Sequence, residues 1–301
     1  MNAARPRGER VAARVPGTPV PAGPGLLART GRKLIRDRGG AFGLGVTIML
    51  LLVALAAPLI APYDPFEIGA DIPLAAPSAA HPFGTDELGR DVLSRIIFGA
   101  QISLSVALLS GLASLVAGVP LGVIAAFRRG AVDAAIGSLF DTIFAFPAVL
   151  LGIALVALLG SGIPNVVLAV AAINVPTVGR LTRVAVQTQL AQDYVEAARA
   201  IGANGPEIAV RHVLPNIAPP LLVQTTVTMA GAVLLEAAFS FLGLGSRPPT
   251  PSWGAMLDGG RAFLAAAPWL GIFPGLAISL MVLGLNSLGD ALQAALDPRR
   301  P

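Results

Sequence analysis

Long apolar runs alternate with shorter polar stretches along most of this chain. Each run has the roughly 17 or more residues that a helix needs to cross a bilayer. Six such runs occur, at residues 41–61, 102–127, 134–160, 163–179, 217–245 and 262–289. The pattern therefore predicts an all-α polytopic membrane protein with six transmembrane helices.

The polar stretches between the runs define the expected organisation. The expected regions are a disordered basic tail at 1–40, a first transmembrane helix at 41–62, an external loop at 63–101, a core of five more transmembrane helices at 102–290 that includes a polar loop at 190–216, and a tail at 291–301. Within the external loop, Thr85 is placed to cap an amphipathic surface helix whose apolar face begins at Leu88 and Val92.

Charge is scarce, and it falls mostly on one side of the predicted membrane. Only 13% of the residues are charged, against about 25% in soluble domains. With a cytoplasmic N-terminus, 17 of the 21 Lys and Arg residues lie on the cytoplasmic side. Because cytoplasmic loops carry the excess of Lys and Arg, both termini are predicted to be cytoplasmic. Topology thus accounts for the basic excess, which gives no indication of nucleic acid binding.

The chain lacks the common motifs of catalysis and nucleotide binding. It has no Cys, and its two His residues, His81 and His212, lie far apart in sequence, so no metal site is expected. No glycine-rich phosphate loop, zinc-protease motif or nucleophile elbow occurs. The prediction is a protein without enzymatic activity or cofactor, so any driving ATP hydrolysis has to occur in a partner.

Polar residues within the apolar runs are candidates for function because their burial in a membrane costs free energy. Asp141 is expected to pair with an Arg near the cytoplasmic face. Glu236 either lines a translocation path or forms a hydrogen bond between helices, and Asn174 has the same two interpretations. Trp253 and Trp269 are expected to anchor the chain at the outer interface.

A stripe of small residues marks the second apolar run. Ser114, Gly118 and Gly122 are spaced four apart, so they share one face of a helix. Such a stripe lets a second helix approach closely, and helix packing is expected there.

The polar stretch at 193–216 has an ordered pattern of its own. A short helix is expected to start at Asp193 and to end in a left-handed cap at Gly202. A second helix is expected to begin at an Asn204 or Gly205 cap and to stop at Leu214-Pro215. A connection between two crossings needs only a few residues. The stretch is therefore predicted to be a docking element, with an ordinary amphipathic loop as the alternative.

This stretch also resembles a known motif. Inner-membrane permeases of binding-protein-dependent ABC importers share the consensus EAA-x3-G-x9-I-x-LP. The chain has Glu196-Ala197-Ala198, then Gly202 after three residues, and it ends the motif with Leu214-Pro215. His212 stands at the isoleucine position, and the run RHVLPN is similar to the variant in peptide-type permeases.

Four other stretches resemble the C-type permease of dipeptide, oligopeptide and nickel importers. They are residues 81–104, 240–245, 248–257 and 296–299, in the order expected for that family. The resemblance covers about residues 35–300.

The resemblance implies a type I ABC importer permease fold in the lipid of the bacterial cytoplasmic membrane. In that family the EAA region is a coupling helix that docks on a cytoplasmic ATPase. The implied coupling residues are Glu196, Ala197, Ala198 and Gly202, with Leu214 and Pro215 at the return to the membrane. The implied partners are a second homologous permease, two ATP-binding subunits and an external substrate-binding protein.

Import of di- or oligopeptides is therefore the predicted function, with glutathione or nickel chelates as alternative cargo. The second hypothesis is a stand-alone secondary transporter or channel. A transporter of that kind needs an internal energy-coupling site such as paired membrane carboxylates, which the sequence does not show. A membrane scaffold is a third hypothesis, and it leaves Glu236 and the ordered polar stretch unexplained.

Overall fold

The structure, a computed structural model, describes residues 33–69 and 71–296. Most of these residues are helical, and no strand occurs among them. The elements in chain order are α2 (Arg38–Ile60), α3 (Val92–Arg128), α4 (Gly130–Phe144), α5 (Ala148–Leu159), α6 (Ile163–Leu190), α7 (Asp193–Ala200), α8 (Gly205–Glu207), the π-helical turn η1 (Ile208–Val213), α9 (Leu214–Phe241), α10 (Trp253–Gly260), the 3-10 turn η2 (Arg261–Phe263) and α11 (Trp269–Leu296). The all-helical prediction is confirmed for this part of the chain.

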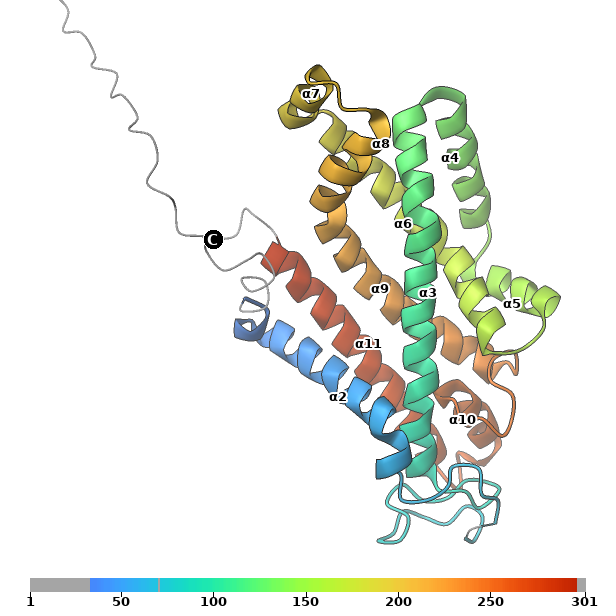
Figure 1. The fold of residues 1–301 in the computed structure, drawn as a ribbon. Coiled ribbons are helices and arrows are strands. Elements are labelled where there is room, and N and C mark those ends of the chain that lie inside the picture. The colour runs from blue at the N-terminus through green and yellow to red at the C-terminus, as the bar shows by residue number, and fades with distance from the viewer. Residues whose placement is uncertain (1–32, 70, 297–301) are drawn as a thin grey trace, which may run out of the picture.

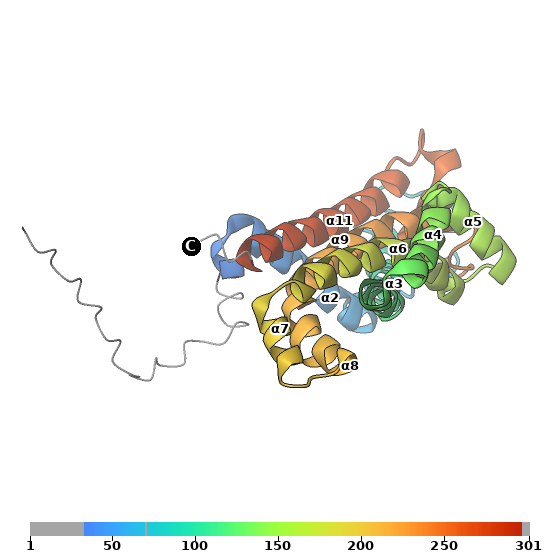
Figure 2. The ribbon, with the colours of Figure 1, turned by 90° about the horizontal axis from the view of Figure 1, so that it is seen from above.

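The long helices form a bundle with different structures at its two ends. Figure 1 shows α7 and α8 at one end and the loop between α2 and α3, residues 61–91, at the other. In the view along the bundle, α4 and α5 lie at one edge, beside α3 and α6 (Figure 2). The predicted tail at 1–40 lies mostly outside the described residues, although residues 33–36 are helical. Of the predicted tail at 291–301, the described residues continue α11.

Five helical stretches of the described chain are long and apolar enough to cross a membrane. The predicted crossing at 134–160 is broken into α4 and α5, which meet at 93°. Pro147 precedes α5, and a proline disfavours helical geometry in the residue before it, so α4 has to end there. The structure thus has five long stretches, or the predicted six crossings if the bent pair counts as one.

The predicted amphipathic surface helix does not exist. Residues 85–90 belong to the loop, and α3 starts at Val92, ten residues before the predicted second crossing. Asp91 caps α3, because its carboxylate accepts bonds from the backbone N–H and the hydroxyl of Ser94, both at 2.7 Å. Thr85 instead closes the loop: its hydroxyl donates to the carbonyl of Ile72 at 2.7 Å and accepts from the N–H of Ala75 at 2.8 Å.

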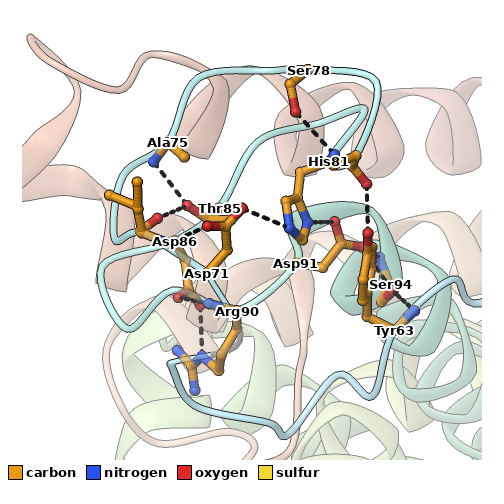
Figure 3. Close-up of polar contacts among 12 residues, drawn as sticks. Tyr63, Asp71, Ala75, Ser78, His81, Thr85, Asp86, Arg90, Asp91 and Ser94 are labelled. Carbon is orange, nitrogen blue, oxygen red and sulfur yellow. Dashed lines mark hydrogen bonds and ion pairs between the residues drawn. The ribbon is translucent and has the colours of Figure 1, made fainter.

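A largely buried network of polar side chains holds the 61–91 loop on the start of α3 (Figure 3). The His81 ring lies between two carboxylates, with Nδ1 2.9 Å from Asp91 and Nε2 3.1 Å from Asp71. It also stacks on the Tyr63 ring at a centroid distance of 4.5 Å. The side chain of Arg90 donates to Asp86 at 2.7 Å. These contacts explain why so polar a loop is compact, since its charged groups find partners within the chain.

The small-residue stripe is confirmed as a helix contact between α3 and α6. A Cβ at Gly118 would lie 2.8 Å from the Cβ of Val178, and one at Gly122 would lie 2.6 Å from that of Thr182. The Ser114 hydroxyl also reaches the carbonyl of Ala171 on α6, at 3.3 Å. Close approach of the two backbones thus depends on residues without large side chains.

The predicted role of Trp253 in an aromatic belt is wrong. Its side chain is 1% exposed and donates its indole N–H to the carbonyl of Ile96 on α3, at 3.0 Å. Trp269 likewise donates to the carbonyl of Thr85, at 3.1 Å. Both indoles find polar partners inside the chain, as buried Trp usually does. They join α10 and α11 to α3 and the 61–91 loop.

Candidate functional site

The segment from Asp193 to Asn216 projects from one end of the bundle, between α6 and α9 (Figure 1). Two short helices, α7 and α8, are joined by a tight turn, and η1 leads into α9. We call residues 193–216 the docking segment. It contains all six residues predicted to form a coupling interface.

The turn between α7 and α8 has the predicted geometry. Gly202 follows the end of α7 with φ +93°, a left-handed conformation that favours glycine. The N–H of Ala203 bonds back to the carbonyl of Ala198 at 3.0 Å, which closes the cap. The Asn204 side chain then accepts from the N–H of Glu207 at 3.0 Å and caps α8. Both predicted caps are confirmed.

A buried apolar base holds the docking segment on the bundle. Val195 and Ala198 of α7 are buried in one cluster with Ile208 and Val213 of η1, against Val186 of α6. Ala198, one of the implied coupling residues, therefore has its side chain inside the bundle. Ala198 lies three residues after Val195, on the same inner face of the helix.

The outer face of α7 carries the remaining predicted residues. Glu196 and Ala197 are exposed, and Glu196 lines a cavity of about 610 Å³ between the end of α6 and α7. Ile201 stands next to the turn with 87% of its surface exposed. Ile201 was not among the residues predicted from the sequence to form the site. An aliphatic side chain directly before a glycine turn was the available signal.

Leu214 and Pro215 do not stop the second helix, contrary to the prediction. The N–H of Leu214 bonds to the carbonyl of Ala209, five residues earlier, so η1 runs into α9 without a break. Pro215 is the second residue of α9, directly after the π-helical turn η1. The second half of the docking segment, α8 and η1, and the membrane helix α9 consequently form one continuous helical stretch, Gly205–Phe241.

Polar contacts fix the far side of the docking segment. The Tyr194 hydroxyl donates to Gln189 of α6 at 2.7 Å, and the Asn216 side chain donates to the carbonyl of His212 at 2.7 Å. The ring of His212 lies 6.5 Å from that of Tyr194. His212 thus takes part in the fold of the segment through its backbone and its ring.

Two ion pairs join α4 to α6. Arg180 pairs with Asp141, which confirms the predicted Arg partner. Arg183 donates two bonds to Asp133, at 2.5 and 2.6 Å. Asn174, predicted either to join helices or to line a path, donates to the carbonyl of Val170 in its own helix at 2.9 Å.

Glu236 lies near the opposite end of α9 from the docking segment, and its side chain is fully buried. Ser103 of α3 donates to one carboxyl oxygen at 3.1 Å, and Ser240 donates to the other at 2.7 Å. The hydroxyl of Ser252, which precedes α10, also interacts with this carboxyl. The predicted hydrogen bond between helices is confirmed. The three serines were missed, although the spacing of Glu236 and Ser240 by one helical turn was visible.

Two family descriptions match the chain. Residues 118–300 match the family described as binding-protein-dependent transport system inner membrane component. Residues 25–77 match the N-terminal TM domain of oligopeptide transport permease C.

Individual relatives cover most of the chain. It is 43% identical over 282 residues to the di/tripeptide transport system permease protein DppC of Pseudomonas aeruginosa, covering 92% of this chain and 93% of the relative. It is 41% identical to the dipeptide transport system permease protein DppC of Alkalihalophilus pseudofirmus, over 89% of this chain and 88% of that one. It is 44% identical to the glutathione transport system permease protein GsiD of Shigella dysenteriae, over 84% of each.

The fold is similar to that of a solved transporter. A chain of the MetNI methionine ABC transporter in an inward-facing conformation aligns with a TM-score of 0.57 and 18% sequence identity. The alignment covers 67% of this chain and 96% of that one. At this identity the likeness concerns the fold alone.

Proposed function

Because the chain belongs to the family of binding-protein-dependent transport system inner membrane components, as permease of an ABC importer in the bacterial cytoplasmic membrane, we propose that its cargo is short peptides. The relatives named above carry dipeptides, di- and tripeptides, or glutathione. Glutathione is itself a tripeptide, so one chemical class covers all three names. Glutathione is the second candidate cargo.

The proposed driving force is ATP hydrolysis in partner subunits that dock on residues 193–216. This proposal rests on the structure of the docking segment, which is buried at its base and exposed at its tip. Its base is buried in the bundle, whereas Ile201 at the turn is 87% exposed. An exposed aliphatic group on a rigid projection is costly in water and suits an apolar pocket on another protein. Glu196 and Ala197 share the exposed side of α7.

The proposed assembly holds this permease, a second homologous permease, two ATP-binding subunits and an external binding protein. The proposed orientation places the docking segment and both termini in the cytoplasm. It is supported by the distribution of Arg, since only Arg90, Arg95, Arg247 and Arg261 would then lie outside. The 61–91 loop would face the external binding protein.

Replacing Gly202 with valine tests the coupling role. At φ +93° a β-branched residue is strained by about 1–3 kcal/mol, so the turn and its exposed tip are expected to shift. No heavy atom lies within 4 Å of a Cβ at this position, so folding and membrane insertion are expected to survive. Uptake, and the ATPase activity that depends on uptake, are expected to fall together in the reconstituted complex.

The matched control is Gly205→Ala in the same segment. Gly205 is helical, and a Cβ there meets only the Phe127 ring, at 3.9 Å. This variant is expected to transport normally. If Gly202→Val retains both transport and stimulated ATP hydrolysis, the docking segment does not couple the two.

A stand-alone secondary transporter remains the competing function. It would need a coupling site inside the membrane, such as two carboxylates that share a proton. The described contacts of Glu236 are instead three serine hydroxyls. Uptake by vesicles that contain this chain alone, driven by a proton gradient without ATP, would favour that competitor.

A further inference from the structure

We propose that Glu236 is a positioning residue that fixes the outer end of α9 to α3 and α10, so that movement of the docking segment reaches the opposite end of the bundle. This inference rests on the proposed function. It gives Glu236 a role in transmission that requires no contact with the transported molecule.

The carboxyl of Glu236 is the centre of a polar cluster contributed by three elements. Ser103 belongs to α3, Ser240 to α9, and Ser252 is the N-cap of α10. All three side chains are buried. Hydrogen bonds in so dry an environment are expensive to leave unmade. The cluster, which we call the serine clamp, thus holds the three elements in one fixed arrangement.

The start of α10 is built around the serine clamp. The Ser252 hydroxyl accepts from the N–H of Ala255 at 3.2 Å and interacts with Glu236, which one hydroxyl can do because it both donates and accepts. Trp253, the next residue, is buried and bonds to the carbonyl of Ile96. Gly254 lies directly against the backbone of Ala237, one residue after Glu236. No room is left for α10 to shift independently of α9.

The turn after α9 is tied to the same cluster. Ser240 donates to Glu236 and accepts from the N–H of Ser246 at 3.4 Å. A Cβ at Gly245 would overlap Ser240, so only a glycine at this position lets the chain fold back. The stretches at 240–245 and 248–257, two of those that resemble the C-type permease, therefore have the same structural role. They close the end of the bundle around Glu236.

The position of the serine clamp explains why it matters for transport. α9 has 28 residues and spans about 42 Å at 1.5 Å per residue. It continues from η1 at one end, and its other end, which carries Glu236, lies beside α10 (Figure 1). Pro219 and Pro220 lie in its first two turns, and the helix from there to Glu236 contains no proline. A continuous helix of this kind passes a displacement at one end to whatever is fixed at the other. The serine clamp is that fixed point.

The chemistry of the contacts separates this role from that of a charged ligand. The partners of the carboxyl are hydroxyls and include no cationic side chain. A glutamine has the same length, and its amide can accept from one serine and donate to another. An aspartate keeps the carboxyl group but is one methylene too short. The serine clamp therefore predicts that Gln replaces Glu and Asp does not, whereas a binding site for a substrate ammonium group predicts the reverse.

The test compares Glu236→Gln, Glu236→Asp and Glu236→Ala in the full complex, reconstituted with its binding protein. Uptake of labelled dialanine is expected to stay within about twofold in the Gln variant and to fall about tenfold or more in the Asp and Ala variants, as loss of buried hydrogen bonds implies. Basal ATP hydrolysis and complex assembly are expected to persist in all three. In the Asp and Ala variants only the stimulation by the loaded binding protein should be lost, a selective loss that a merely unstable protein would not show, whereas the Gln variant should keep this stimulation.

Loss of uptake in an assembled Gln variant, or retention of uptake in the Ala variant, overturns the proposal. If the Glu236 variants do not assemble, Ser103→Ala with Ser252→Ala removes two hydroxyls at a smaller cost in packing. Normal stimulation in that double variant would equally overturn it. Failure of the unaltered complex to take up peptide under ATP would instead contradict the proposed function.

Discussion

Two neighbouring residues, Ile201 and Gly202, have complementary roles at the tip of the docking segment. Gly202 permits the left-handed turn, and the turn exposes Ile201. An exposed aliphatic side chain alone needs no explanation. Ile201, however, is held on a turn above a buried base, and we propose that this turn presents it to a partner protein.

Ile201→Ala is therefore expected to weaken binding of the ATPase without affecting the chain itself. Burial of such a side chain contributes about 1.5–3 kcal/mol, which corresponds to roughly tenfold to hundredfold in affinity. The change in affinity is measured from the amount of ATPase that copurifies with the variant as the ATPase concentration is varied. Ile68→Ala, at a 65% exposed isoleucine in the 61–91 loop, is the matched control. Unchanged ATPase recovery from Ile201→Ala would show that Ile201 is not a contact.

Single residues were predictable from the sequence where their roles are local. The caps at Gly202 and Asn204 depend on neighbours within five residues, and both predictions are confirmed. The role of Trp253 depends on Ile96, which lies 157 residues away in the chain. General preferences of Trp for membrane interfaces carry no information about such a contact.

At the scale of elements, the bundle depends on close backbone contacts and on well-defined helix ends. The contact of α3 with α6 follows the stripe of small residues that the sequence displays. The start of α3 was misplaced because Thr85-Asp86-Glu87 looks like a helix start. In the structure these side chains form contacts within the 61–91 loop instead of capping a helix. Thr85 bonds to Ile72 and Ala75, and Asp86 pairs with Arg90. Sequence patterns do not reveal such long-range competition.

Gly122→Leu is expected to disrupt the α3–α6 contact. Its side chain would enter the space of Thr182 and the α6 backbone, and such overpacking costs about 1–3 kcal/mol. The disruption of this contact would appear as a lower thermal unfolding midpoint of the variant in detergent. Gly45→Leu, on an exposed position of α2 with no atom within 4 Å of its Cβ, serves as the control. Equal midpoints for the two variants would mean that the α3–α6 contact tolerates bulk.

For the molecule as a whole, the pattern of apolar runs was enough to predict a helical membrane protein, and the motifs were enough to identify the family. Orientation in the membrane follows from charge alone and is still a prediction. Pro147 lies inside the third apolar run, and the 93° break there depends on tertiary contacts: α4 packs on α3 and α6, whereas α5 packs on α6 and α9.

The orientation can be tested directly because the chain has no Cys. Glu67→Cys in the 61–91 loop and Arg199→Cys in α7 are both exposed positions at opposite ends of the bundle. In intact spheroplasts, an impermeant maleimide is expected to label only the first. Labelling of Arg199→Cys without lysis would reverse the orientation and remove the docking segment from the cytoplasm.

The most direct test of the central claim is purification of the chain in mild detergent, with its companions identified by mass spectrometry. An ATP-binding protein and a second homologous permease are expected to be recovered with it in stoichiometric amounts. Recovery of the chain alone, or only with copies of itself, while it still takes up peptide, would contradict the central claim.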